Sequence, residues 1–356
     1  MDFGIALATD ATSWQATLRA EELGFSHAWF YDTQMLTADP FVAMAVAATK
    51  TSRIRLGTGV LVPSNRIAPA AACAFASLNK LAPGRIDFGV GTGFTARRAM
   101  GQGAILLSEM EEYIRVVMGL LDEETIDVTL DGKPRKIRFL NPDLGLTNTR
   151  DPVALHLSAF GPKGMEMTAR LGAGWINFVG NVAVGIAWLQ SMQTAWENAG
   201  HHRADLSACA FALGCVLEPG EPADSPRSMA QAGPRAAVML HRAADEALTG
   251  LPNSSPMPAS VADLVQGYVA SAKNFEPAEA PWLHNHRGHL MFVKPDERQF
   301  INAELIRMNT FTGTEAEIKP RIEALRDAGY TEFTIQLVPG QEHAIEDWAR
   351  IKRAFS

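Results

Sequence analysis

The stretch NKLAPGRIDFGV (residues 79–90) places the end of a helical pattern, a Pro-Gly turn and a short apolar run in direct succession. The same succession, with glycine at the end of each helical pattern, returns in three further segments: EELGFSHAWFY (21–31), ARLGAGWINFV (169–179) and RDAGYTEFTIQLV (326–338). Glycine closes the last turn of a helix in the left-handed conformation. An apolar strand directly after it is typical of a parallel sheet covered by helices. The recurring unit therefore predicts an α/β architecture.

Helix and strand patterns alternate along the chain. Eight segments fit as strands: 3–8, 27–31, 54–61, 86–91, 153–158, 174–179, 207–216 and 332–338. Eight segments fit as helices: 12–23, 39–50, 69–81, about 107–121, 162–171, 182–199, 314–328 and 343–354. This alternation predicts an α/β fold, a (β/α)8 TIM barrel built from residues 1–356 as one domain, rather than an open sheet.

Two insertions enlarge the predicted barrel, because a barrel core needs only about 250 residues. Residues 122–150 come after the fourth strand and contain two alternating runs around Asp131-Gly132, which is a hairpin signal. Residues 217–306 come after the seventh strand and hold Pro/Ser-rich tracts and two helical stretches. Tracts of this length between core elements commonly form lids or binding loops. We expect both insertions at the C-terminal mouth, where barrel active sites are built.

Composition excludes several classes of partner. A net charge of −7 over 356 residues argues against nucleic acid. The sequence has no apolar run near the ~20 residues of a membrane span, and its first residues, MDFGIALATD, lack the basic start of a secretory signal. The spacing of the three cysteines fits neither a metal site nor a disulfide framework. We therefore expect a cytoplasmic protein that binds neither membranes nor metal.

Glycine-rich loops follow two of the predicted strands. GVGTGFTARRAMG (89–101) is not a dinucleotide fingerprint, because Phe94 stands where G-x-G-x-x-G requires its third glycine. This loop is either a tight turn with solvated arginines or backbone that lies close to a ligand. The second loop, SAFG (158–161), precedes a helix that begins at Pro162, and the amides at a helix N-terminus suit a phosphate. The two loops together indicate a phosphorylated cofactor lying across the mouth.

Four segments together resemble the bacterial luciferase-like superfamily of flavin- and deazaflavin-dependent oxidoreductases. They are AEELGFSHAWFYD, DPFVAMAVAATKTSRIRLGTGVLVPSNR, PAAACAFASLNKLAPGRIDFGVGTG and FGPKGMEMTARLGAGWINF. The resemblance covers most of residues 20–100 and 155–180, and insertion 217–306 carries no motif that matches it. It implies a (β/α)8 barrel that binds FMN or the deazaflavin coenzyme F420 at the C-terminal ends of the strands. It also implies a homodimer.

The resemblance assigns cofactor contacts by position. It implies that Gly59-Val60 forms a bulge behind the isoalloxazine ring, often with a non-prolyl cis peptide bond. It implies ring contacts from Thr92 and Gly93. It places the cofactor phosphate on four consecutive residues: Ser158, Ala159, Phe160 and Gly161.

The chain also departs from one branch of this superfamily. The sugar-phosphate dehydrogenases carry Asp-His after the second strand and a glutamate after GTG, where this chain has Asp32-Thr33 and Phe94. They place a lysine for the substrate phosphate after the sixth strand, where this chain reads NFVGN (177–181). A sugar-phosphate substrate is therefore not expected.

Aromatic residues dominate the predicted mouth. Tyr31, Phe94, Trp175 and Phe178 fall at or near strand ends. They favour a small apolar or aromatic substrate, although a barrel interior also needs bulky side chains.

Candidates for acid–base chemistry are few. Asp32 ends the second strand, where it could act on a substrate or cap the next element. The tract HNHRGH supplies His284, His286 and His289, which could donate a proton near neutral pH or lie exposed in a loop. Arg287 could bind an anionic substrate group or pair with a lid carboxylate.

Three functions remain open, and the sequence favours the first. The first is an FMN-dependent monooxygenase of the two-component type, which receives reduced flavin from a separate flavin reductase and oxidises a small apolar or aromatic substrate. In it, the insertion 217–306 would close over the site and exclude water. The second is hydride transfer between the deazaflavin coenzyme and an organic substrate. The third is a non-catalytic flavin-binding protein.

Overall fold

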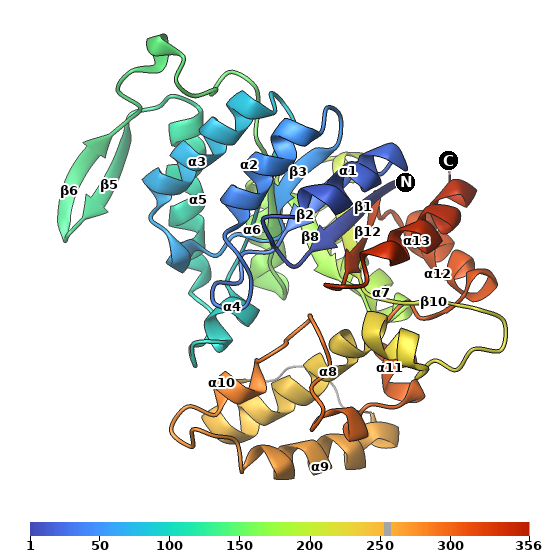
Figure 1. The fold of residues 1–356 in the computed structure, drawn as a ribbon. Helices are drawn as coiled ribbons and strands as arrows, with labels where there is room; N and C mark the ends of the chain where they lie inside the picture. The colour runs from blue at the N-terminus through green and yellow to red at the C-terminus, as the bar shows by residue number, and fades with distance from the viewer. Residues whose placement is uncertain (253–257, 356) are drawn as a thin grey trace.

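The computed structural model describes residues 1–252 and 258–355. In these ranges eight parallel strands close into a barrel in the order β1-β12-β9-β8-β7-β4-β3-β2 (Figure 1). The barrel strands are β1 (Asp2–Leu7), β2 (His27–Phe30), β3 (Arg55–Thr58), β4 (Ile86–Gly91), β7 (Ala154–Ser158), β8 (Gly174–Phe178), β9 (Ala208–Ala212) and β12 (Glu332–Leu337). The predicted (β/α)8 barrel is confirmed, and each predicted strand is found within a few residues of its expected place.

Strand β1 closes the barrel. It pairs with β12 on one side, from Asp2 opposite Glu332 onward, and with β2 on the other. Strand β9 is shorter than predicted because the chain beyond it pairs elsewhere. There, β10 (Val216–Leu217) and β11 (Gly313–Thr314) form a short parallel pair that brings the two ends of the long insertion together.

Helices form the outer ring around the strands (Figure 1). They are α1 (Trp14–Glu22), α2 (Pro40–Lys50), α3 (Ala68–Leu81), α5 (Leu107–Leu121), α6 (Pro162–Arg170), α7 (Val182–Asn198), α12 (Glu315–Ala328) and α13 (Ile345–Lys352). Local sequence fixes their starts. Asp39 accepts hydrogen bonds from the first amides of α2, and Thr314 with Glu317 makes the expected capping box on α12.

Side chains fill the barrel interior, so the barrel is a packed core. Trp29 of β2 is fully buried, and its ring lies 5.7 Å from that of Phe211 on β9. Its indole Nε1 donates to Glu332 of β12 over 3.0 Å. Deeper polar groups are paired too, since Asp87 of β4 binds Arg55 of β3 in a bidentate contact.

The hairpin insertion consists of β5 (Ile126–Leu130) and β6 (Lys133–Ile137). Asp131 and Gly132 form its turn with positive φ angles of 51° and 71°. The hairpin lies at the far end of the molecule from α8, α9 and α10, so the expectation that it stands at the C-terminal mouth is wrong (Figure 1). It follows helix α5 rather than strand β4 directly, and a helix returns the chain to the N-terminal end of the barrel. Asn148 accordingly bonds to Asn79 in the last turn of α3.

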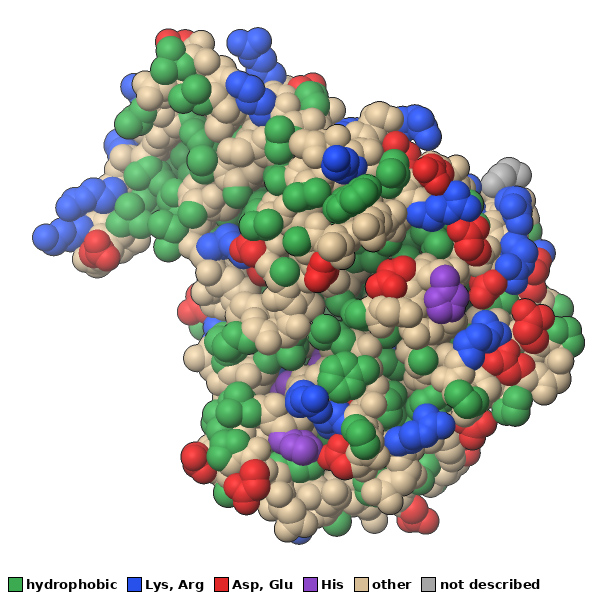
Figure 2. Space-filling view, in the orientation of Figure 1, with side chains coloured by type: hydrophobic (Ala, Val, Ile, Leu, Met, Phe, Trp, Pro, Cys, Tyr) green, Lys and Arg blue, Asp and Glu red, His purple; other side chains and the backbone are tan. Residues whose placement is uncertain are grey.

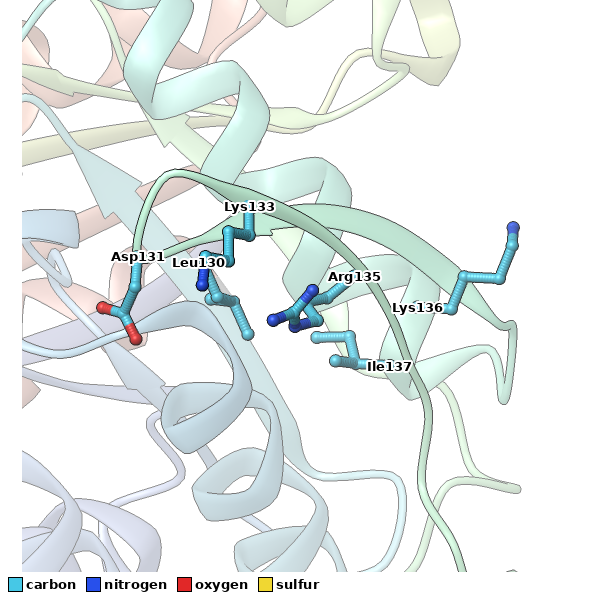
Figure 3. A pocket seen from close by; sticks show the side chains of 6 residues that line it. All are labelled: Leu130, Asp131, Lys133, Arg135, Lys136 and Ile137. Carbon is cyan, nitrogen blue, oxygen red and sulfur yellow. The ribbon is translucent and has the colours of Figure 1, made fainter.

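A cavity of about 340 Å³ lies against the hairpin (Figure 3). Its lining residues are Leu130, Asp131, Lys133, Arg135, Lys136 and Ile137. Lys and Arg side chains gather at this corner of the surface (Figure 2). Because it is built from the hairpin alone, this cavity is no part of the barrel mouth.

Insertion 217–306 is called the lid below, and its described residues, 217–252 and 258–306, form a helical layer beneath the mouth in the view of Figure 1. Its helices are α8 (Pro226–Thr249), α9 (Ala262–Ala272), α10 (Trp282–Asn285) and α11 (Ala303–Asn309). Leu240, Val265, Tyr268 and Leu305 belong to its own hydrophobic core, separate from that of the barrel. None of the helices in the described ranges is both long and apolar enough to cross a bilayer.

Candidate functional site

Glycines at the ends of β3 and β4 bring backbone together at the mouth. The Gly59-Val60 peptide bond is cis, as the resemblance implied. A Cβ added to Gly59 would meet Trp29 Cβ at 2.8 Å, and one added to Gly91 would meet Val60 Cγ2 at 2.7 Å. Gly93, with φ of 81°, precedes the short helix α4 (Phe94–Arg98). These positions admit no larger residue, so backbone rather than side chains forms the rim at the ends of β3 and β4.

The second glycine loop joins β7 to α6. Ser158 and Ala159 are buried, whereas Phe160 is 45% exposed. Gly161, with φ of 77°, is the N-cap of α6, and a Cβ there would meet nothing within 4 Å. A cavity of about 610 Å³ between α6 and α7 opens beside Gly161. The first amides of α6 are therefore sterically accessible to an anion.

Two of the four predicted substrate aromatics lie in the barrel interior near the rim. Tyr31 is buried and its hydroxyl donates to Gln336 Oε1 over 2.9 Å. Phe178 packs edge-on against the interior Phe211. Trp175 points the other way: it is fully buried, and its indole stacks on Tyr330 outside the strands. Trp175 is thus not brought to the mouth.

Phe94, the residue that broke the dinucleotide fingerprint, joins the barrel to the lid. Its ring is covered by the guanidinium of Arg98 at 3.9 Å and by that of Arg242, from α8, at 4.7 Å. Burial lowers the pKa of Arg242 to about 9, with Arg235 and Arg98 adding repulsion. Arg98 also pairs with Asp245 of α8 at 2.8 Å, and both side chains are under 5% exposed. Arg98 therefore holds the lid, whereas Arg97 donates to the Gly103 carbonyl in its own loop.

Asp32 is buried and hydrogen-bonded to two other groups of the protein. One carboxylate oxygen accepts from the Val62 amide at 2.9 Å and from Arg66 at 2.8 Å. Its side chain is 2% exposed. Asp32 thus ties the end of β2 to the loop after β3, which positions the cis Gly59-Val60 segment, and the geometry favours this role over the predicted acid–base one.

A strap of two residues, His289 and Leu290, crosses the mouth. His289 Nε2 lies 3.5 Å from Thr95 Oγ1 in α4, directly after β4. The Leu290 carbonyl accepts from Gln336 Nε2 of β12 over 2.7 Å. Strands β4 and β12 stand four places apart in either direction around the eight-stranded barrel, that is, on opposite sides. The strap therefore contacts opposite sides of the mouth.

The rest of the histidine tract is placed less centrally. His286 is buried, with Nε2 3.0 Å from Asp245 and with no partner for Nδ1 among the described residues. His284 bonds to Asp296 and stacks on Phe275 within the lid. The exposed Arg287 lies over the Phe292 ring at 5.3 Å. Among the residues described, no three His, Cys, Asp or Glu side chains are grouped to hold a metal ion.

Behind the strap lies a buried chain of polar groups. His289 Nδ1 is 2.8 Å from His241 Nδ1, and His241 Nε2 is 3.0 Å from Glu297 Oε2. Burial opposes ionisation of Glu297, but His241 and the Lys294 ammonium at 2.8 Å outweigh it and lower the pKa of Glu297 to about 2. Burial lowers the pKa of His241 to about 4. Glu297 is thus a carboxylate and His241 a neutral ring at neutral pH.

Sequence reasoning missed the contribution of α8. Arg235 and Arg242 are seven residues apart, and His241 and Asp245 are four apart, so each pair shares a side of the helix. These charged side chains are among apolar ones in a helix whose alanines and leucines are buried. A polar stripe on a buried helix was the available signal, because charges are rarely buried without a partner.

Comparisons with known proteins identify the family and the fold. Residues 13–338 match the family described as luciferase-like monooxygenase. An F420-dependent glucose-6-phosphate dehydrogenase of Kineococcus radiotolerans is 31% identical over 176 residues, which cover 45% of this chain and 50% of that protein. The chain thus spans about half the length of the curated relatives it matches.

Two solved structures share the fold over nearly the whole chain. An F420-dependent secondary alcohol dehydrogenase in complex with an F420-acetone adduct has a TM-score of 0.67 and 17% identity, covering 98% of this chain and 97% of that one. A monooxygenase from Streptomyces bottropensis has a TM-score of 0.62 and 18% identity, covering 100% of both chains. At this identity the likeness establishes the fold alone.

Proposed function

This chain belongs to the luciferase-like monooxygenase family, and from that premise we propose that it is an oxidoreductase that transfers a hydride between coenzyme F420 and a small alcohol or ketone. Sequence reasoning left FMN and F420 open, with FMN preferred. The F420-dependent relative and the F420-dependent enzyme of the same fold support the deazaflavin instead.

The observation that carries the proposal is the backbone surface at the mouth. Gly59 and Gly91 have no room for a side chain, and they lie beside the aliphatic Val60. The backbone at Gly161, at the N-terminus of α6, is accessible. These residues fit a flat ring with a phosphate-bearing tail. Gly59-Val60, Thr92 and Gly93 would hold the ring, and residues 158–161 the phosphate; once bound, the coenzyme would supply the hydride chemistry.

The substrate proposal follows from the polarity of the rim. Tyr31 and Phe178 give the interior side of the mouth an aromatic lining, which suits a small organic molecule. Asn181, near the place of the phosphate-binding lysine in the sugar-phosphate branch, uses its side chain to cap α7 at Val184. An uncharged alcohol or ketone therefore fits better than a sugar phosphate.

A direct binding measurement tests which coenzyme the protein uses. Purified full-length protein is titrated with F420 and, separately, with FMN, by calorimetry or by the change in coenzyme fluorescence. We expect F420 to bind at least about tenfold more tightly, followed by F420 reduction with a panel of secondary alcohols. Binding of FMN alone, together with oxygen-dependent turnover, would contradict the proposal.

An FMN-dependent monooxygenase is the second candidate, supported by the family itself and by the monooxygenase of the same fold. It requires reduced flavin from a separate flavin reductase. Monooxygenase activity is measured as oxygen consumption with chemically reduced FMN and candidate aromatic substrates. No turnover with either coenzyme would favour a non-catalytic flavin-binding protein. In each case we expect a homodimer, which sedimentation measures independently.

A further inference from the structure

Alcohol oxidation releases a proton as well as a hydride, so the proposed site needs a group that takes the proton. That group must stand over the mouth, where the substrate oxygen would lie. His289 meets this requirement of position, because the strap fixes it between Thr95 on the β4 side and Gln336 on the β12 side. Leu290, with φ of 62°, is held in the left-handed region that non-glycine residues seldom adopt. Such conformations cluster at functional sites.

The buried chain of polar groups fixes which nitrogen of His289 carries the proton. A carboxylate only accepts hydrogen bonds, so His241 Nε2 must donate to Glu297. Lys294 Nζ also lies 3.5 Å from His241 Nε2, but three nearer acceptors account for its three N–H groups: Glu297 at 2.8 Å and the Asn285 and His284 carbonyls at 3.0 and 3.2 Å. Neutral His241 therefore offers an unprotonated Nδ1.

The same reasoning applies to the His289 ring. With His241 Nδ1 as acceptor, His289 Nδ1 must donate across their 2.8 Å contact. Neutral His289 then has a free lone pair on Nε2, the nitrogen at the mouth. Its contact with the Thr95 hydroxyl is long, at 3.5 Å, so this lone pair is weakly engaged.

We propose that His289 is the catalytic base of this enzyme: its Nε2 takes the hydroxyl proton of the alcohol, and Glu297 acts through His241 to hold the ring in the required tautomer. The inference rests on the proposed hydride transfer. As the carbon–hydrogen bond gives its electron pair as hydride to the hydride-accepting deazaflavin, the O–H proton goes to Nε2 and the C=O bond forms. Ketone reduction runs the same exchange in reverse. Glu297 and His241 are positioning residues, in the manner of the aspartate that orients a triad histidine.

The charged and titratable groups that face His289 come from α8 and from the segment after α10. They are His241, Arg242, His286 and Lys294. Burial and these neighbours lower the pKa of His289 well below its usual value, so the ring is unprotonated at neutral pH. It is in the state that accepts a proton.

The tautomer is measured in the full-length protein without coenzyme, by nitrogen-15 NMR of labelled histidine rings. His289→Asn identifies the His289 signals by their loss. We expect a protonated Nδ1 and an unprotonated Nε2 at pH 7; the opposite tautomer overturns the proposal. Glu297→Gln, whose amide can donate to His241, should shift His289 toward the opposite tautomer, whereas His284→Asn should not. An unchanged tautomer in a folded Glu297→Gln protein overturns the role of Glu297.

Kinetics test the base itself. With a secondary alcohol and F420, His289→Asn should lower kcat by about 10²–10⁴-fold, the usual contribution of a general base. The F420 dissociation constant should stay within about threefold, and added imidazole should restore part of the rate. An unchanged kcat overturns the proposal. If the wild-type chain binds no F420, the hydride-transfer function fails, while the tautomer measured without coenzyme still decides whether the relay exists.

Discussion

Replacing Asp245 by Asn tests how the lid is fastened to the barrel. Asp245 is 2% exposed and binds Arg98 at 2.8 Å, His286 at 3.0 Å and Asn285 at 2.8 Å. The variant keeps the shape of the side chain but removes the charge, which leaves the buried Arg98 without its counter-ion. Removing one partner of a buried pair costs about 3–5 kcal/mol.

The Asp245–Arg98 contact determines which part of the molecule loses this stabilisation. Asp245 belongs to α8 and Arg98 to α4, so the energy is lost between lid and barrel. At about 1.4 kcal/mol per tenfold change, the population of opened lid should rise by a factor between about 100 and a few thousand. Amide hydrogen exchange should accelerate by this factor in α8 while β1 and β12 keep their protection.

A control variant and the pH dependence of stability make this test more specific. Glu112→Gln removes an ion pair with Arg115 whose side chains are about half exposed, and it should change stability by under ~1 kcal/mol. His286 and Arg98 overcome burial and lower the pKa of Asp245 below 3.8. The stabilisation is therefore complete above pH 3.8 and is lost as the pH falls through the folded value. Exchange in α8 that is unchanged at pH 7 would refute the assignment of the pair as the lid fastening.

Other perturbations probe separate parts of the molecule. The folded-state pKa of His241 lies at about 4 against 6.5 unfolded, so the free energy of unfolding should fall as the pH drops from 6.5 toward 4; urea titrations of His241→Asn should show a shallower slope there, and equal slopes would contradict the assignment. Gly91→Ala, whose Cβ would press on Val60, should weaken F420 binding by about 5- to 100-fold, as overpacking of 1–3 kcal/mol implies. Gly103→Ala, where the nearest atom is 3.5 Å away, is its control, and equal affinities in calorimetry would count against the glycine surface. Replacing 126–137 by a short linker should leave coenzyme affinity unchanged, since the hairpin stands at the other end of the barrel; a loss of affinity beyond about threefold would argue otherwise.

The barrel could be predicted from sequence because its signals are local. Each helix end, glycine and apolar strand lie within about a dozen residues, as in NKLAPGRIDFGV. The orientation of side chains within the strands could not be predicted, because barrel strands are buried on both faces and read as continuous apolar runs. Trp175 and Phe178 look alike in sequence, yet Trp175 packs on Tyr330 outside the strands and Phe178 on Phe211 inside. The predicted position of the hairpin is wrong for a topological reason: helix α5 lies between strand β4 and the hairpin and returns the chain to the other end of the barrel.

The lid contacts could not be predicted because they join residues far apart in the chain. Arg98 and Asp245 are separated by 147 positions, and His241 and His289 by 48. The sequence shows the histidine tract, but it does not show which histidine reaches the mouth. His284 lies within the lid, and His289 crosses the mouth because the Leu290 carbonyl binds Gln336. Only the fold distinguishes these two histidines, since five positions along the chain separate a ring bonded to Asp296 from one placed over the barrel.

The separate roles of the barrel and the lid have a physical consequence for the proposed enzyme. The barrel would supply the surface for the coenzyme, whereas the lid carries the proposed proton acceptor, so neither part is sufficient alone. The contacts that hold the lid closed, Arg98 with Asp245 and Leu290 with Gln336, are also the contacts that set His289 over the mouth. Opening the lid to exchange substrate would therefore remove the base, and closing it would restore the base while excluding water. Proton transfer and closure would then be one event, and a lid loosened at Asp245 would lose kcat before it lost coenzyme affinity.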